Sequence, residues 1–136
     1  MKREEKQEAE EVLTRLFSGA TLTDVGDDFT STYIRLKFKG KGGEPLVITV
    51  ENEWELTPPR SFFTLMANHE VVTSISLGEN YPHLIVCFSG GETLRANGID
   101  SLYESWQAGT KTQDYLVVAC PGGTLAIWVP ENEQSL

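Results

Sequence analysis

Three glutamates that alternate along one short segment are the first residues in this sequence with the potential for specific chemistry. The segment 50–56 has the sequence VENEWEL. In an extended strand, successive side chains point to opposite faces, so Glu51, Glu53 and Glu55 would line one face. Such an acidic stripe suits a basic protein surface or a cation, although exposed acids more often do nothing specific. We therefore take these three residues as candidate partner-binding residues.

A second candidate group lies where an aromatic strand is expected at about 103–108. Alternation there would place Tyr103 on one face and Glu104 with Trp106 on the other. Tyrosine and tryptophan are favoured anchors at protein interfaces, so Tyr103, Glu104 and Trp106 join the candidate partner-binding residues. Burial statistics give the competing prediction, in which Trp106 and Trp128 are core residues.

Paired glycines at 42–43, 90–91 and 122–123 invite comparison with phosphate-binding loops. A phosphate loop needs Lys followed by Ser or Thr, and then a helix, whereas a dinucleotide site needs GxGxxG opening a helix. Here each pair leads into a strand-like run instead. We interpret the pairs as hairpin turns, which need the positive φ that glycine adopts freely.

The histidines and cysteines predict no metal or catalytic centre. Neither His69 nor His83 has a second ligand at metal-binding spacing, and both are expected in turns or on the surface. Cys87 and Cys120 lie in apolar runs, which predicts buried free thiols with raised pKa values. No GxSxG nucleophile elbow is present. We therefore predict no cofactor, no metal and no catalytic residue, and we favour binding over catalysis while leaving enzymatic activity open.

One helix and a series of short strands must position these residues. Apolar residues at 3.6-residue spacing predict a helix over 4–17, which Ser18 and Gly19 end. From residue 20 onward, β-branched and aromatic runs between turn residues predict antiparallel strands. We place these strands at about 20–25, 29–39, 44–52, 71–77, 83–89, 92–97, 103–108, 114–120 and 124–129.

The sequence predicts the structure of two of the connections between these strands. Gly26, Asp27 and Asp28 are expected to form the turn between the first two strands. Between the third and fourth, residues 58–67 predict a short second helix, with proline at its first position and Phe62 and Leu65 on one face.

Length and composition bound the class of protein. The chain has 136 residues, 40% of them apolar and 23% charged, which predicts a single globular domain over 1–136. Within it we expect the helix at 4–17, a β-rich body at 20–130 and a short tail at 131–136.

The charge of the chain narrows its partners. The formal net charge is −9, most of it in the body, which disfavours nucleic acid and favours a basic protein partner. The N-terminus predicts no secretory signal, and no apolar run approaches the length of a membrane span. We therefore expect a cytoplasmic protein that does not bind membranes, with homo-oligomer formation left open.

The C-terminal third resembles a group of small, functionally uncharacterised bacterial proteins. The matching features are Tyr-Glu-Ser-Trp at 103–106, Pro-Gly-Gly at 121–123 and Leu-Ala-Ile-Trp at 125–128. The resemblance spans about residues 71–129 and implies a small β-rich accessory domain. Some similar proteins are suspected to be immunity proteins of bacterial toxin systems. The resemblance carries no catalytic residues.

Together these features predict an α+β fold, with the N-terminal helix packed on a mainly antiparallel, curled sheet that forms a partly open barrel or a sandwich. The first functional hypothesis is a non-enzymatic protein-binding module, in its most concrete form an immunity-type inhibitor of a basic toxin or enzyme. The alternative is a small-molecule-binding or catalytic domain with a cavity in the curled sheet and Glu104, His69 or His83 at its mouth. A third hypothesis is self-association through an edge strand.

Overall fold

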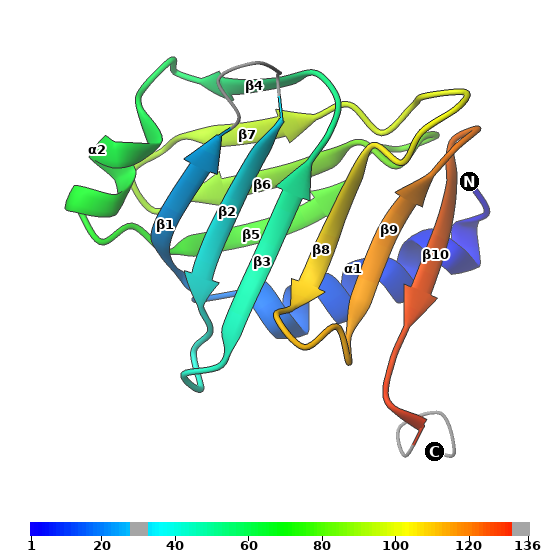
Figure 1. Cartoon of the computed structure of the whole chain (residues 1–136), viewed down its shortest axis with the longest axis horizontal. Helices are drawn as coiled ribbons and strands as arrows, with labels where there is room; N and C mark the ends of the chain where they lie inside the picture. The colour runs from blue at the N-terminus through cyan, green and yellow to red at the C-terminus, as the bar shows by residue number, and fades with distance from the viewer. Residues whose placement is uncertain (28–32, 132–136) are drawn as a thin grey trace.

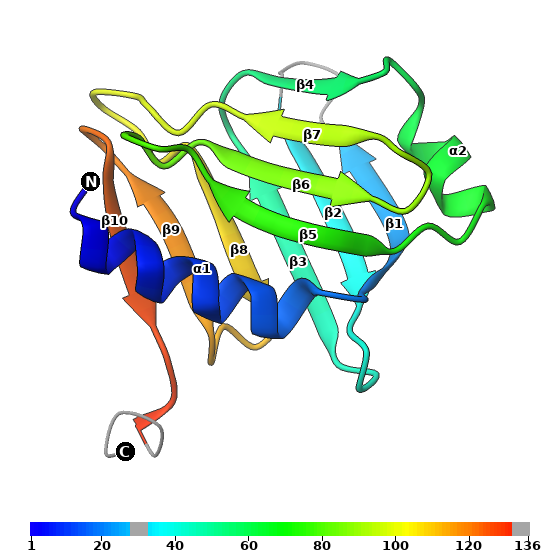
Figure 2. The same cartoon turned by 180° about the vertical axis from the view of Figure 1, so that it is seen from behind.

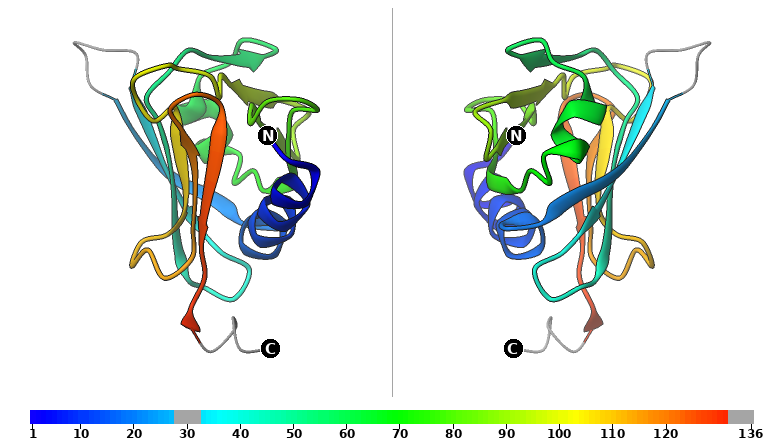
Figure 3. Two further views of the ribbon diagram at one scale, coloured as in Figure 1. Left: turned by 90° about the vertical axis from the view of Figure 1, so that its right-hand side faces the viewer. Right: turned by 90° about the vertical axis from the view of Figure 1, so that its left-hand side faces the viewer.

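Two antiparallel sheets, stacked face to face with their strands running crosswise, form the body of the protein (Figure 1, Figure 3). The computed structural model describes residues 1–27 and 33–131. The larger sheet has the strand order β1 (Thr21–Asp27), β2 (Ile34–Lys39), β3 (Pro45–Val50), β8 (Trp106–Thr110), β9 (Leu116–Cys120) and β10 (Thr124–Trp128). The smaller sheet has the order β4 (Trp54–Thr57), β7 (Thr93–Ala96), β6 (Leu84–Phe88) and β5 (Val72–Leu77). Neither sheet closes into a barrel, so the sandwich form of the predicted α+β fold is the one found.

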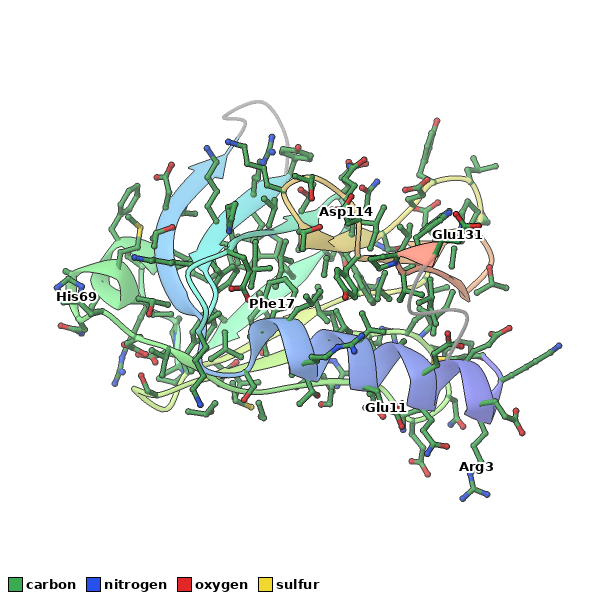
Figure 4. All side chains as sticks on the ribbon, turned by 90° about the horizontal axis from the view of Figure 1, so that it is seen from below. Arg3, Glu11, Phe17, His69, Asp114 and Glu131 are labelled. Atoms are coloured by element: carbon green, nitrogen blue, oxygen red, sulfur yellow. The ribbon has the colours of Figure 1, made fainter. Side chains whose placement is uncertain are left out.

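Helix α1 (Arg3–Phe17) lies beside β5 and extends the smaller layer under β8, β9 and β10 (Figure 2). The Glu10 carboxylate accepts a hydrogen bond from the Leu77 backbone N–H at 2.9 Å, so the helix also covers part of the β5 edge. Figure 4 shows Arg3 and Glu11 pointing away from the sheets. The helix ends as predicted, with Gly19 at a φ of 78°. Its buried residues are the predicted ones: Ala9, Val12, Leu13, Leu16 and Phe17.

The core fills the space between the two sheets. Strand β2 alternates buried and exposed residues along its whole length, as expected for a strand with one face in solvent. Three phenylalanine rings cross the core. Phe17 packs edge-on against Phe38 with ring centres 5.5 Å apart, and Phe38 stacks on Phe88 at 6.5 Å. These contacts join α1, the larger sheet and the smaller sheet in one hydrophobic core.

The three glycine pairs lie in hairpin turns, as predicted. Gly43, Gly91 and Gly123 have φ angles of 93°, 95° and 78°, at the turns before β3, β7 and β10. The predicted turn at 26–28 was wrong in its position, because Gly26 and Asp27 still pair with Arg35 and Ile34 of β2. Asp28 lies outside the described residues.

The largest departure from prediction is where the chain crosses between the sheets. Strand β3 ends at Val50, and β4 begins at Trp54 in the other sheet, so the alternating segment 50–56 is not one strand. Strand β4 was not among the predicted strands. Strand β8 begins at Trp106 and not at 103. The second predicted helix is found as α2 (Phe62–Ala67), with Ser61 as its N-cap, so both prolines precede the helix.

Trp106 links the two sheets. It is completely buried, on β8 between β3 and β9. Its indole Nε1–H donates a 2.7 Å hydrogen bond to the carbonyl oxygen of Pro82, in the loop between the smaller sheet's β5 and β6. The core prediction for Trp106 is therefore confirmed. The same prediction for Trp128 was wrong, because that ring is 52% exposed on the edge strand β10.

Replacing Trp106 by phenylalanine tests this link. The smaller ring leaves a void and deprives the Pro82 oxygen of its donor, so we expect Trp106→Phe to lower the free energy of unfolding by about 2–4 kcal/mol. Trp128→Phe is the matched control and should change it by no more than about 0.5 kcal/mol. Urea denaturation of both variants measures the difference, and equal effects would contradict a special role for Trp106.

Candidate functional site

Four loop segments meet at one end of the larger sheet, where β3 and β9 end and β8 and β10 begin. They are residues 51–53, 78–83, 97–105 and 121–123, and we call them together the loop rim. In Figure 1 these connections lie along the upper right of the molecule. The rim joins loops from both sheets and contains most of the candidate residues.

Asn52 joins the two candidate groups, which are about fifty residues apart in the sequence. Its side-chain amide donates to the Ile99 carbonyl oxygen at 2.9 Å and to the Ser105 hydroxyl at 3.0 Å. The Glu51 N–H donates to the Ser105 carbonyl oxygen at 2.8 Å. Ser105 is fully buried, so the two bonds that it accepts connect the rim to the interior of the protein at the base of the rim.

Further hydrogen bonds hold the remaining segments together. The Gly98 N–H donates to Nδ1 of His83 at 3.0 Å, and the Gly122 N–H donates to the Asp100 carbonyl oxygen at 2.8 Å. A methyl group on Gly98 would overlap the carbonyl oxygen of Pro82. The loops are therefore packed backbone to backbone, which restricts their conformations.

The rim presents four large apolar side chains to solvent. Tyr81 is 50% exposed, Ile99 40%, Leu102 73% and Tyr103 68%. Asp100 fixes two of them, since its carboxylate accepts hydrogen bonds from the N–H groups of Leu102 at 2.8 Å and Tyr103 at 3.0 Å. These two bonds lower the pKa of Asp100, because they favour its charged form. The turn is thus held in one conformation with both side chains outward.

The charge of the rim has one sign. Its segments contain five carboxylates and no lysine or arginine. His83 adds no positive charge at neutral pH, since burial and the nearby Arg95 lower its pKa. The carboxylates are Glu51, Glu53, Glu79, Asp100 and Glu104.

The six sequence-predicted residues fall into three places. Glu51, Glu53, Tyr103 and Glu104 are exposed on the rim. Glu55 is exposed on β4, where it pairs with Arg95 of β7, so the three glutamates do not line one strand face. The Trp106 ring lies beneath the rim, and its burial leaves no surface for a partner. Sequence reasoning missed Asn52, Tyr81 and Leu102, although Asn97-Gly98 and Asp100-Ser101 are turn signals that could have placed a loop there.

Two grooves lie next to the rim, on the outer face of the smaller sheet. One of about 620 Å³ is bordered by Lys6, Tyr81, His83 and Arg95. A second of about 370 Å³ shares His83 and Arg95 and reaches Glu53 and Glu55. Both are open to solvent and lie outside the space between the sheets, where core side chains pack. Of the residues suggested for the mouth of an internal cavity, His83 borders these grooves, whereas His69 is exposed at the end of α2.

The chemistry of the remaining polar groups is limited. Cys87 and Cys120 are free thiols on different sheets, and both are half-buried. Burial and the nearby Glu104 raise the pKa of Cys120. Within residues 1–27 and 33–131, no three His, Cys, Asp or Glu side chains gather as a metal site. Over the same ranges, neither helix is long and apolar enough to cross a membrane.

A buried carboxyl pair lies away from the rim, at the turn between β6 and β7. Glu92 accepts a 2.6 Å hydrogen bond from Arg60, and Glu70 accepts one of 2.8 Å from the Gly90 N–H. The second oxygen of Glu92 is buried without another donor, so it is satisfied when Glu70 carries a proton and donates it. Burial and this hydrogen bond raise the pKa of Glu70, whereas the bonds from Glu70 and Arg60 lower that of Glu92. The arrangement therefore favours a proton on Glu70 and a charge on Glu92.

Gly98→Ala tests the close packing of the rim. Because the added methyl group meets backbone, we expect a loss of about 1–3 kcal/mol in the free energy of unfolding. A Cβ atom at Gly26 would have no neighbour within 4 Å, so Gly26→Ala is the control and should stay within about 0.5 kcal/mol of wild type. Thermal unfolding compares them, and a tolerated Gly98→Ala would show that the loops can separate without cost.

The carboxyl pair predicts a pH dependence of stability. Since the pKa of Glu70 is higher in the folded than in the unfolded chain, its contribution is complete below the ordinary value of 4.5 and is lost as pH rises through the folded pKa. Glu92 shows the opposite sign, and its contribution is lost as pH falls through its lowered pKa. Glu70→Gln keeps the hydrogen bond without titrating.

We therefore expect Glu70→Gln to gain stability relative to wild type as pH rises above 4.5. Urea denaturation of both chains over a pH series measures this gain. Glu79→Gln, at an exposed position on the rim, is the control and should follow the wild-type curve. Parallel curves for wild type and Glu70→Gln would mean that Glu70 ionises without cost.

The loop rim is aromatic and acidic, and internal hydrogen bonds hold its segments together. It offers exposed apolar anchors and carboxylates of one sign. No known protein family, curated protein or solved structure matches this chain.

Proposed function

We propose that this protein is a non-enzymatic protein-binding module whose loop rim docks onto a basic protein surface. In its most concrete form it is an immunity-type inhibitor of a basic toxin or enzyme. The observation that carries the proposal is the joining of two distant acidic and aromatic segments by Asn52 into one surface without lysine or arginine.

The apolar and the acidic side chains of the rim would contribute to binding in different ways. Tyr81, Leu102 and Tyr103 are large, outward-facing groups of the kind that provide most of the free energy at protein interfaces. The carboxylates around them would attract a basic partner from a distance and so raise the association rate. Because the loops are held together by their own hydrogen bonds, binding would order few additional residues.

The positions of three basic side chains on β2 support the approach of a basic partner from the side of the rim. On β2, the side chains of Arg35, Lys37 and Lys39 are exposed on the outer face of the larger sheet, beyond the rim segments. A basic partner is therefore drawn toward the rim and repelled from this face, within the roughly 8–10 Å over which charges act at physiological salt. The non-enzymatic role is supported by the use of the rim's own polar groups, such as Asn52 and Ser105, to hold the loops.

A small-molecule-binding domain is the second candidate, and one observation favours it. Arg95 borders both grooves, and its side chain makes no hydrogen bond or ion pair with another residue in the ranges 1–27 and 33–131. A guanidinium in such a position suits a carboxylate or phosphate group. Arg95→Ala separates the candidates, since it should abolish ligand binding in the groove and leave docking by the rim intact.

Capture of a partner tests the main proposal. Tagged full-length chain would be incubated with lysate of the source organism at low and at moderate salt, and any captured protein would be purified for binding kinetics. We expect Tyr103→Ala to weaken binding at least about tenfold, since it removes an interface anchor. Glu53→Lys should mainly slow association, with a smaller effect at moderate salt.

Two matched controls lie away from the rim. Phe63 is an aromatic residue of similar exposure, 67%, on α2, and Glu8 is an exposed acid on α1. Phe63→Ala and Glu8→Lys should bind as wild type does. Failure to capture any protein at either salt concentration, or equal effects of control and rim variants, would overturn the proposal.

A further inference from the structure

Three of the four outermost strands have edges that are covered or interrupted. Strand β1 has a register shift between Leu22 and Asp24, and Asp24 pairs with Lys37 at 3.9 Å. Helix α1 lies along β5 and places the Glu10 carboxylate on its Leu77 N–H. Strand β4 has only four residues and is followed by two prolines. Bulges, charges, prolines and covering elements are the features by which proteins prevent edge strands from pairing.

Strand β10 has neither a bulge nor a charged side chain, and its nearest following proline, Pro130, lies two residues beyond its end. It pairs with β9 in regular register over all five of its residues, and the stretch 124–130 contains no charged side chain. In Figure 3 (left) it is the outermost strand of the larger sheet and faces the viewer. Trp128 is 52% exposed there, and its pairing partner on β9 is Leu116.

We propose that β10 pairs antiparallel with β10 of a second copy of this chain, so that the two larger sheets join into one continuous sheet. An open strand edge offers backbone donors and acceptors, and the partner that satisfies them is another extended strand. Two identical strands that pair antiparallel are related by a twofold axis.

The charge of the chain limits where a second copy can dock. Two chains that each carry −9 repel, so they can meet closely only where neither has charged side chains. The stretch 124–130 meets that requirement, whereas the edge strands β1 and β4 carry Asp24 and Glu55. The central residue of β10, Ala126, would face its own copy across the axis, and a small side chain there allows close approach.

This assembly goes beyond the proposed function and leaves it intact. A twofold axis through the middle of β10 turns the second copy's strands end for end. The two loop rims would then lie at opposite ends of the joined sheet, both available to partners.

Charge substitutions at the axis test the proposal. Ala126 is half-buried and pairs with Val118, on the face of β10 opposite to Leu125 and Ile127, which pack against the core. We expect wild-type chain to sediment as a dimer at high concentration, and Ala126→Lys and Ala126→Glu each to sediment as monomers with wild-type circular dichroism. An equimolar mixture of the two variants should restore the dimer, because Lys then faces Glu across the axis.

The same pair of substitutions at Thr57, on the edge of β4, is the control and should leave the wild-type dimer unchanged. A wild-type chain that is monomeric at the highest concentration would overturn the proposal. So would a dimer of either Ala126 variant alone, or a mixture that stays monomeric, since only pairing at Ala126 predicts recovery by opposite charges.

Discussion

A single buried hydrogen bond, from the Trp106 indole to the Pro82 carbonyl oxygen, is the constraint on which the rest of this structure depends. It joins the larger sheet to the loop between two strands of the smaller sheet. His83, directly after Pro82, accepts a hydrogen bond from the Gly98 N–H. Ser105, directly before Trp106, accepts one from the Asn52 side-chain amide. A buried polar contact of this kind has few alternatives, because an unpaired indole N–H or carbonyl in the core costs about 1–3 kcal/mol. The position of the loops at this end of the molecule therefore follows from the packing of one side chain.

The same packing explains how an acidic surface can be built without instability. Carboxylates of one sign repel, but the segments that carry them are joined through neutral groups: backbone amides, the Asn52 amide and the Ser105 hydroxyl. Asp100 gains two backbone donors from its own turn. Repulsion between exposed charges is weak in water and salt, so these local bonds outweigh it.

Much of the fold could be predicted from local sequence. The spacing of Val12, Leu13 and Leu16 gave the first helix, and the paired glycines gave three hairpins, because both signals depend on residues close in the chain. The crossing between sheets at Glu51–Glu53 could not be predicted in this way. The turn there is stabilised by hydrogen bonds from Asn52 to Ile99 and Ser105, which lie roughly fifty residues away in the sequence. The alternating pattern of VENEWEL contains no information about these distant partners. For the same reason Trp128, which is as apolar as Trp106, was placed in the core: exposure at a sheet edge is a property of topology and not of residue type.

The carboxyl pair at Glu70 and Glu92 also changes how the charge of this protein should be counted. A formal charge of −9 assigns a full negative charge to every Asp and Glu. The raised pKa of Glu70 means that this carboxyl keeps its proton to a higher pH in the folded chain than in the unfolded chain, so the formal sum overstates the negative charge of the folded chain in that range. Where Glu70 keeps its proton in the folded chain and loses it in the unfolded chain, folding is therefore coupled to proton uptake.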